Sequence, residues 1–307
     1  WSFVGDVAKG YFETILAKGE KMSHVPETHI STTNTAFKVP DEFAQFTGEL
    51  FLEMISLLGK RTAQMHCVLS SDLDDPAFSP EPFSLLYQRS LFQSIQGLVQ
   101  KSLRLLEKKL TSLPLTVYED ARYLMNNEYT IIETLRQLIH QRITSSKIRI
   151  HGDYHLGQVL YTGKDFVIMD FEGEPARPLS ERKLKRSPFR DVAGMFRSFD
   201  YAAYNVLISS PAIMETHFKA LQNWVEPWYH YISTLFFQSY LKESQNSCFI
   251  PQSPEQIDIL LQSFLIEKAV YELSYELNNR PEWVSIPLKG LIRICREKMH
   301  HKKSRAG

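Results

Sequence analysis

Apolar residues along this chain recur mainly at intervals of three and four positions, which predicts a largely helical protein. The clearest stripe lies between residues 43 and 69 and consists of Phe43, Phe46, Leu50, Met54, Leu57, Leu58 and Met65. Similar patterns and their flanking breakers predict helices at about 82–110, 118–141, 188–207, 254–279 and 287–300.

One short segment departs from the helical period. Residues 158–161 and 166–169 are mostly apolar, β-branched or aromatic, and the turn-forming residues 162–165 separate them. This arrangement predicts a β-hairpin. The expected fold class is therefore mainly α with a small β-hairpin.

The residues on either side of this hairpin carry the candidate chemistry. The run His151-Gly152-Asp153-Tyr154-His155-Leu156-Gly157-Gln158-Val159-Leu160 precedes it, and Asp170-Phe171-Glu172 follows it. Kinase-type phosphoryl transfer uses a carboxylate that orients the attacking hydroxyl, an amide at the metal, and a second carboxylate that bridges metal and phosphates. Asp153, Gln158 and Asp170 occur in that order, and a hairpin would bring them together around a magnesium ion.

Two other interpretations of the first run are open. In a purely structural turn, Gly152 and Gly157 would supply unusual backbone angles while Asp153 caps nearby amides. In a metal hydrolase, His151, Asp153 and His155 would be alternate ligands on an extended segment. The turn leaves the second run unexplained, and the hydrolase needs further ligand blocks that the other histidines do not form.

A glycosidase is a third possibility. Asp153, Asp170, Glu172 and Glu174 could offer a carboxylate pair for acid and base roles. The helical surroundings and Gln158 favour the kinase interpretation. Glu172 and Glu174 fit local structure or a second metal contact better than independent catalysis.

Composition excludes several classes of protein. The 307 residues include 35 basic and 35 acidic ones, so net charge gives no reason to expect nucleic acid or an anionic membrane as partner. No stretch approaches the roughly 20 apolar residues that cross a bilayer. Cys67, Cys248 and Cys295 are odd in number and lack metal-ligand spacing, which indicates thiols in a reducing compartment, and thus a cytoplasmic protein.

Two further segments could take part in binding. The basic segment from Arg177 to Arg190 is typical of a solvated charged loop, although one or two of its cations could pair with nucleotide phosphates or acidic neighbours. Asp191, which follows it, could favour the helix dipole or hold the backbone of the catalytic run. The role of the segment 177–190 stays open.

A stripe near the C-terminus has the residue types of a sugar site. Lys268, Tyr271 and Tyr275 are spaced by three and four, so they share one face of a helix. Tyrosine rings can stack on the apolar face of a pyranose, and hydroxyl and ammonium groups can bond its oxygens. The alternative is a snorkelling lysine with two boundary tyrosines.

The nucleotide-binding half of a kinase is not visible in the sequence. No Gly-x-Gly pair occurs before residue 150, and no Gly-Lys-Ser or Gly-Lys-Thr occurs anywhere. The chain begins with Trp1 rather than methionine. We therefore expect a piece of a longer protein whose nucleotide-binding N-terminal lobe lies upstream.

Taken together, the motifs resemble those of the maltokinases, including maltokinases fused to trehalose synthase. The resemblance is carried by the runs 151–160 and 170–175, by Arg177-Pro178, Glu181-Arg182, Ser187–Met195 and Arg197–Tyr201, and outside this region by Arg61–His66, Pro82-Phe83, Tyr87–Ser90, Asn279–Pro281 and Trp283. It covers most of the chain.

The resemblance implies the aminoglycoside-phosphotransferase branch of the protein-kinase-like fold. Residues 1–307 would be its C-terminal lobe, with a helical part at 1–147, the catalytic loop, hairpin and basic loop at 148–190, and a helical acceptor-binding part at 191–307. The implied activity is an ATP-dependent, magnesium-dependent maltokinase that transfers the γ-phosphate to the anomeric hydroxyl of maltose, giving maltose 1-phosphate. A trehalose synthase domain would be a partner in the same polypeptide or pathway.

The resemblance also assigns roles to residues. Asp153 would be the catalytic base, Gln158 and Asp170 the magnesium ligands, and Lys268, Tyr271 and Tyr275 would help to bind maltose. Two alternatives remain: a related small-molecule kinase with another acceptor, or a non-catalytic sugar-binding or regulatory module attached to trehalose synthase.

Overall fold

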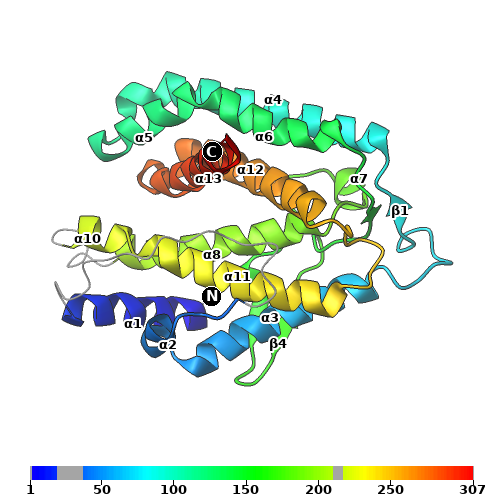
Figure 1. Ribbon diagram of the computed structural model, residues 1–307, viewed down its shortest axis with the longest axis horizontal. Coiled ribbons are helices and arrows are strands. Elements are labelled where there is room, and N and C mark those ends of the chain that lie inside the picture. The colour runs from blue at the N-terminus through cyan, green and yellow to red at the C-terminus, as the bar shows by residue number, and fades with distance from the viewer. Residues whose placement is uncertain (1, 19–36, 210–216, 307) are drawn as a thin grey trace. The chain divides into compact units, whose positions relative to one another are not determined.

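The computed structural model describes residues 2–18, 37–209 and 217–306, and this part of the chain is mainly helical (Figure 1). It divides into two compact units, each built from two stretches of chain. The first unit comprises Trp1–Glu81 and Lys147–Ile250, and the second comprises Pro82–Ser146 and Pro251–Gly307. The boundaries expected between the three parts of the C-terminal lobe, at residues 147/148 and 190/191, stay a prediction.

The first unit contains the candidate catalytic residues. Its elements are α1 (Ser2–Lys18), α2 (Asp41–Thr47), α3 (Glu49–Val68), η3 (Leu156–Gln158), β3 (Val159–Tyr161), β4 (Phe166–Ile168), α7 (Leu179–Arg182), α8 (Phe189–Ser209), α10 (Phe218–Gln222) and α11 (Val225–Ser244). Its core includes the long contact of α3 with α11 (Figure 1). Gly59 permits that contact, because a β-carbon there would collide with the backbone oxygen of Phe236.

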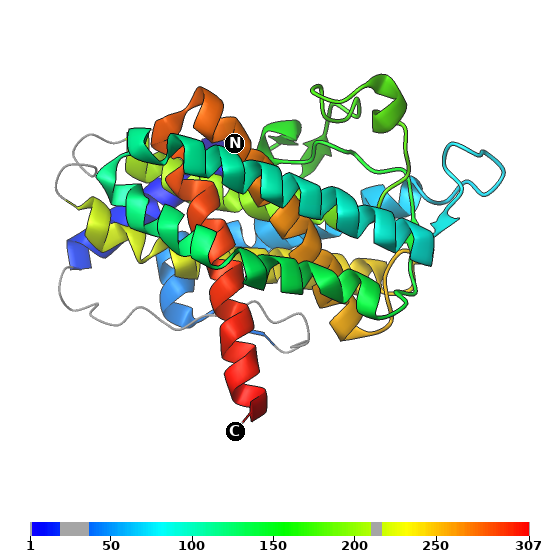
Figure 2. The ribbon, with the colours of Figure 1, turned by 90° about the horizontal axis from the view of Figure 1, so that it is seen from above.

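The second unit is a helical assembly. Its elements are α4 (Leu85–Lys109), η2 (Leu110–Ser112), α5 (Leu115–Asn126), α6 (Glu128–His140), α12 (Pro254–Asn279), η4 (Pro281–Trp283) and α13 (Ser285–Ala306). Figure 2 shows α4 and α6 running side by side, with α13 crossing α6. The buried residues of α4 recur every three or four positions, so one apolar stripe packs against α6 and α12: Leu91, Ile95, Val99, Leu103 and Leu106.

The predicted hairpin is confirmed. Strands β3 and β4 are antiparallel, with Val159 opposite Ile168 and Tyr161 opposite Phe166. The turn is closed by the amide of Thr162, which donates to the carbonyl oxygen of Asp165 at 2.9 Å. A second small sheet pairs β1 (Glu81–Pro82) with β2 (Ser146–Lys147).

Two of the predicted helices are each interrupted once. The helix expected at 43–69 breaks at Gly48, whose φ of 85° is a left-handed conformation that glycine adopts without steric cost. The helix expected at 118–141 breaks at Asn127, whose side-chain amide donates to the carbonyl oxygen of Tyr123 at 2.8 Å and so replaces a helical hydrogen bond. The prediction of two uninterrupted helices from periodicity was wrong because the apolar stripe continues through both breaks.

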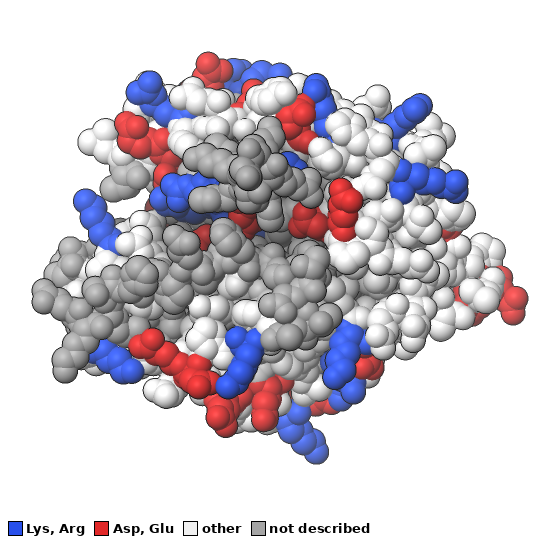
Figure 3. All heavy atoms as spheres, in the orientation of Figure 1, with Lys and Arg blue, Asp and Glu red and all other residues white. Residues whose placement is uncertain are grey.

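The expected fold class is otherwise observed, and the helices at 188–207 and 254–279 correspond to α8 and α12. Acidic and basic side chains are interspersed over the face drawn in Figure 3, in line with the balanced charge. Within the described ranges, no helix is both long and apolar enough to cross a membrane.

Candidate active site

The backbone of the predicted catalytic run is held by Asp191, a buried residue in the first turn of α8. One carboxylate oxygen accepts from the amide of His151 at 2.8 Å, and the other accepts from the amide of Gly152 at 3.0 Å. Of the two roles weighed for Asp191, the structure shows the second, because the side chain fixes the loop that carries Asp153.

A buried histidine and a buried tyrosine support Asp191 in turn. His66 lies with its Nε2 3.0 Å from Asp191 Oδ2 and its Nδ1 3.0 Å from the hydroxyl of Tyr240. Both contacts are hydrogen bonds when His66 Nε2–H donates to the carboxylate of Asp191 and the hydroxyl of Tyr240 donates to His66 Nδ1. Burial alone would raise the pKa of Asp191, but the hydrogen bonds from His66 and from the backbone amide of Gly152 help to lower it on balance.

The loop also packs tightly against α8 and α3. A β-carbon at Gly194 would lie 2.5 Å from the carbonyl oxygen of Tyr154, so only glycine lets α8 approach this closely. Ser198 Oγ accepts from the amide of Leu156 at 2.9 Å, and the hydroxyl of Tyr154 lies 2.8 Å from Thr62 Oγ1. Burial raises the pKa of Tyr154, so the phenol stays protonated and serves as a structural hydrogen-bonding group.

His151 joins the catalytic run to the residues before Asp170. Its Nε2 lies 2.7 Å from the carbonyl oxygen of Met169, and its Nδ1 accepts from the amide of Asp153 at 3.4 Å. Its ring also packs against that of Phe171, with centroids 4.9 Å apart. Both ring nitrogens are therefore used within the protein, which removes His151 from the metal-hydrolase interpretation.

His155 has a similar local role, since its Nδ1 accepts from the amide of Gly157 at 2.9 Å. Within the described ranges, no group of three or more His, Cys, Asp or Glu side chains is placed to hold a metal ion. The three-ligand hydrolase site that the sequence left open is not formed.

The hairpin brings Gln158 and Asp170 into direct contact, as the sequence predicted. Gln158 Nε2 donates to Asp170 Oδ2 at 2.9 Å, and the amide of Met169 donates to the carbonyl oxygen of Gln158 at 2.9 Å. Asp170 has a φ of 63°, the left-handed conformation that few residues other than glycine adopt. This backbone turns its carboxylate back toward Gln158.

The Gln158–Asp170 pair has the donor set that a magnesium ion requires. The hydrogen bond uses the amide nitrogen of Gln158 and one oxygen of Asp170, which leaves an amide oxygen and a carboxylate oxygen. Magnesium is bound in phosphotransferases by one or two such oxygen ligands together with substrate phosphates and water. The residues present therefore fit the ion that the sequence predicts.

Asp153 lies in the part of the loop that these contacts fix. Its side chain is 15% exposed, and its Oδ2 is 3.9 Å from His155 Nε2. A carboxylate in this partly exposed position can accept a proton from a hydroxyl that approaches from solvent. The predicted base is thus accessible, while the backbone around it is anchored by Asp191.

The basic segment is more structured than a solvated loop. Lys185 is only 8% exposed, and its ammonium group donates to the backbone oxygens of Pro76 and Ser79 and lies 3.3 Å from Glu81. Arg182 donates to the backbone oxygens of Arg177 and Pro175. The solvated interpretation is wrong for Lys185, and the pairing with an acidic neighbour is confirmed.

The tip of the hairpin is tied to α3 by a bidentate ion pair. Arg61 donates through Nε and Nη2 to the two carboxylate oxygens of Asp165, at 2.8 and 2.7 Å. This hydrogen bonding lowers the pKa of Asp165 to about 2. The pair fixes the hairpin that presents Gln158 and Asp170.

The predicted sugar-binding stripe lies on α12, in the second unit. Lys268 Nζ is 5.5 Å from the centroid of the Tyr271 ring, and Tyr275 is 47% exposed. The guanidinium of Arg280 lies 5.4 Å from the Tyr275 ring while it donates to both oxygens of Glu276. The stripe is partly solvent-exposed, as a binding face requires, and its role in binding a sugar stays a prediction.

The sequence interpretation assigned no role to His66, Tyr240 or Ser198. His66 could have been noticed, because it falls on the buried stripe of α3 with Leu58 and Thr62, where a titratable group needs a partner. Nothing in the local pattern identifies Tyr240 or Ser198, since their partners are distant in the sequence.

Comparison with known proteins finds distant relatives of this chain. The chain is 24% identical over 152 residues to a glucosamine kinase of Streptacidiphilus jiangxiensis and 27% identical over 142 residues to one of Mycolicibacterium smegmatis. These matches cover 50% and 45% of the chain but 32% of each relative, so the matched region is about a third of their length. No model of a known protein family matches the chain.

Solved structures of glucosamine kinase share the fold. One crystal form matches with a TM-score of 0.64 and 21% identity over 91% of this chain and 62% of that one. A complex with glucosamine, ADP and inorganic phosphate matches with a TM-score of 0.65 over 91% of this chain and 64% of that one. The predicted fold class is thereby confirmed, because the chain shares the fold of glucosamine kinase over about nine tenths of its length, and its sequence is distantly similar to glucosamine kinases.

Proposed function

We propose that the protein carrying this chain is an ATP-dependent sugar kinase, and that the chain supplies its catalytic loop and its acceptor-binding helices. The observation that carries this proposal is the contact between Gln158 and Asp170 across the β3–β4 hairpin, at 2.9 Å. A structural turn gives no reason for an amide and a carboxylate to meet there, with Asp170 in a left-handed conformation.

In the proposed reaction, Asp153 orients the acceptor hydroxyl and takes its proton as the oxygen attacks the γ-phosphorus of ATP. The bond between that phosphorus and the β,γ-bridging oxygen breaks, and ADP leaves. Gln158 and Asp170 would hold magnesium, which neutralises charge on the phosphates. Asp191 and His66 act on the backbone of the loop and keep Asp153 in place.

The acceptor that the relatives favour is glucosamine rather than maltose. The named relatives are glucosamine kinases, and one solved complex contains glucosamine and ADP. The α12 stripe suits either sugar, because Tyr271 and Tyr275 could stack on any pyranose. Maltose remains the second candidate because of the motifs shared with maltokinases; a trehalose synthase partner belongs to that candidate alone.

We expect one buried residue of α12 to distinguish glucosamine from maltose. Glu272 lies four positions after Lys268 and three before Tyr275, so it shares their helical face, and it is 9% exposed. A carboxylate there suits the ammonium group of an amino sugar, and maltose has no such group. Glu272→Gln should therefore raise the KM for glucosamine by about tenfold and leave the KM for maltose unchanged.

The test is mass spectrometry of the products formed by the full-length protein from magnesium-ATP and single sugars. We expect a phosphorylated glucosamine, and Glu272→Gln should reduce its rate of formation at low sugar concentration. Phosphorylation of maltose alone would move the assignment to maltokinase. If the folded protein phosphorylates no sugar, the alternative of a non-catalytic module replaces this proposal.

A further inference from the structure

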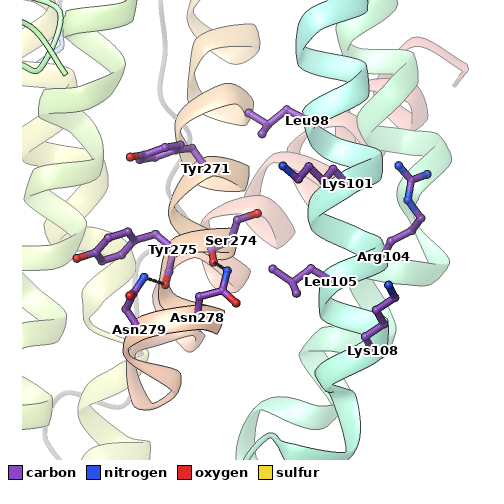
Figure 4. Close-up of a pocket in the computed structure, with 10 residues that line it drawn as sticks. All are labelled: Leu98, Lys101, Arg104, Leu105, Lys108, Tyr271, Ser274, Tyr275, Asn278 and Asn279. Atoms are coloured by element: carbon purple, nitrogen blue, oxygen red, sulfur yellow. Dashed lines mark hydrogen bonds between the residues drawn. The ribbon is translucent and has the colours of Figure 1, made fainter. Parts of the chain in front are cut away.

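A groove of about 640 Å³ lies between α4 and α12, in the second unit (Figure 4). Its floor is apolar and is formed by Leu98 and Leu105 of α4. On the side of α12 the groove is lined by Tyr271, Ser274, Tyr275, Asn278 and Asn279 (Figure 4). The groove therefore shares Tyr271 and Tyr275 with the predicted sugar-binding stripe.

The rim of the groove is cationic. Lys101, Arg104 and Lys108 line it from α4, all three are exposed, and no acidic residue lines it. Within the described residues, none of the three has a carboxylate partner. In a chain with equal numbers of acidic and basic residues, this is a local excess of positive charge.

Two polar side chains of α12 that line the groove are already engaged within the protein. Ser274 Oγ lies 2.6 Å from Ser102 Oγ, and Asn278 donates to the carbonyl oxygen of Ser274 at 2.9 Å. Asn278 also accepts from Lys109 Nζ at 3.0 Å. Between the two helices the groove offers apolar surface and positive charge.

The spacing along α4 matches a helical ligand. Leu98 and Leu105 are seven positions apart, and Lys101 and Lys108 repeat the same interval, so both sets extend about 10 Å along the axis. A helix with apolar residues on one face and carboxylates beside them would place the first on the leucines and the second on the cations. An unpartnered face of this kind is typical of helix-in-groove recognition.

We propose that the α4–α12 groove is a docking site for an acidic amphipathic helix of a protein partner. The helix would lie along α4, bury its apolar residues against Leu98 and Leu105, and pair its carboxylates with Lys101, Arg104 and Lys108. Because Tyr271 and Tyr275 also line the groove, the docked helix would lie against the predicted sugar-binding stripe, and the proposal is tested by binding rather than by activity.

The test uses the full-length protein and a fluorescein-labelled helical peptide of about two heptads, with Leu at core positions and Glu at flanking positions. A scrambled peptide of the same composition is the matched ligand. We expect saturable binding in the range of about 1–50 µM by fluorescence anisotropy, and binding at least about tenfold weaker for the scrambled peptide. An increase in salt from about 50 to about 500 mM should weaken binding.

The protein variant is K101Q/R104Q/K108Q, and the control is R89Q/R122Q/R136Q, which removes three exposed cations of the same unit outside the groove. We expect the first to bind the peptide about tenfold more weakly, because three partly screened ion pairs are lost, and the control to bind within about twofold of the unchanged protein. Circular dichroism verifies that both variants are folded.

Several results would overturn the proposal. If both variants lose the same affinity for the peptide, the effect is one of general charge. If the patterned and scrambled peptides bind equally well, the surface binds acidic peptides without recognising an amphipathic helix. Displacement of the peptide by glucose 6-phosphate would assign the groove to a small phosphorylated ligand. Absence of saturable binding below about 1 mM would leave the groove without this function.

Discussion

The role of Asp191 gives a prediction whose size follows from its contacts. Three donors converge on this buried carboxylate: the amides of His151 and Gly152, and the His66 ring. Asp191→Asn keeps the shape but replaces one acceptor oxygen by an NH2 group. At least one buried donor then faces another donor, at a cost of about 1–3 kcal/mol, and the remaining bonds lose the strength that the charge provides.

The expected loss in the free energy of unfolding is about 2–4 kcal/mol, a large part of the roughly 5–15 kcal/mol typical of a folded protein. Chemical denaturation measures the total. Hydrogen exchange followed by mass spectrometry gives the local effect, and the peptide that covers residues 151–157 should exchange faster in Asp191→Asn.

The control is Asp41→Asn, because Asp41 is also in the first turn of a helix but its side chain is 81% exposed. It should lose less than about 0.5 kcal/mol. If Asp191→Asn loses no more than this control, and exchange in residues 151–157 is unchanged, then the carboxylate does not hold the catalytic loop and the reasoning is refuted.

Three further predictions concern other parts of the structure. Gly194→Ala should destabilise the protein by about 1–3 kcal/mol, because its β-carbon meets backbone of the catalytic loop; Gly97→Ala, which has open space in helix α4, should be neutral or stabilising by up to about 1 kcal/mol in the same denaturation assay. Asp165 should titrate at about 2 by NMR. Because this pKa is depressed, the ion pair with Arg61 should stabilise the hairpin above about pH 4 and be lost as the pH falls toward 2, and a normal pKa in the unchanged protein would contradict the pairing. Tyr275→Ala should weaken acceptor binding in calorimetry without lowering the melting temperature, whereas unchanged affinity would return this residue to a structural role.

The sequence predicted the hairpin and the meeting of Gln158 with Asp170 because both depend on local information. A two-strand pattern with a short turn fixes the register, and the register decides which residues lie at the end of the ladder. The helix breaks at Gly48 and Asn127 were missed for the opposite reason. A single residue ends each helix there, while the apolar stripe continues past it.

The support of the catalytic loop could not be predicted in the same way. Asp191 was a candidate because it follows the motifs closely, but its partner His66 lies 125 residues away in the sequence. Tyr240 is farther still from His66, by 174 residues. Such contacts depend on the tertiary packing of α3, α8 and α11, which one sequence does not reveal.

The central claim is that Asp153 is the base of a phosphotransferase site whose metal ligands are Gln158 and Asp170. The most direct test is the steady-state rate of sugar phosphorylation by Asp153→Asn in the full-length protein, with Asp6→Asn as an exposed control on α1. The account predicts that kcat falls by about a thousandfold or more in Asp153→Asn, that the KM for magnesium-ATP stays nearly unchanged, and that the control is fully active. Near-normal turnover by Asp153→Asn would contradict the account.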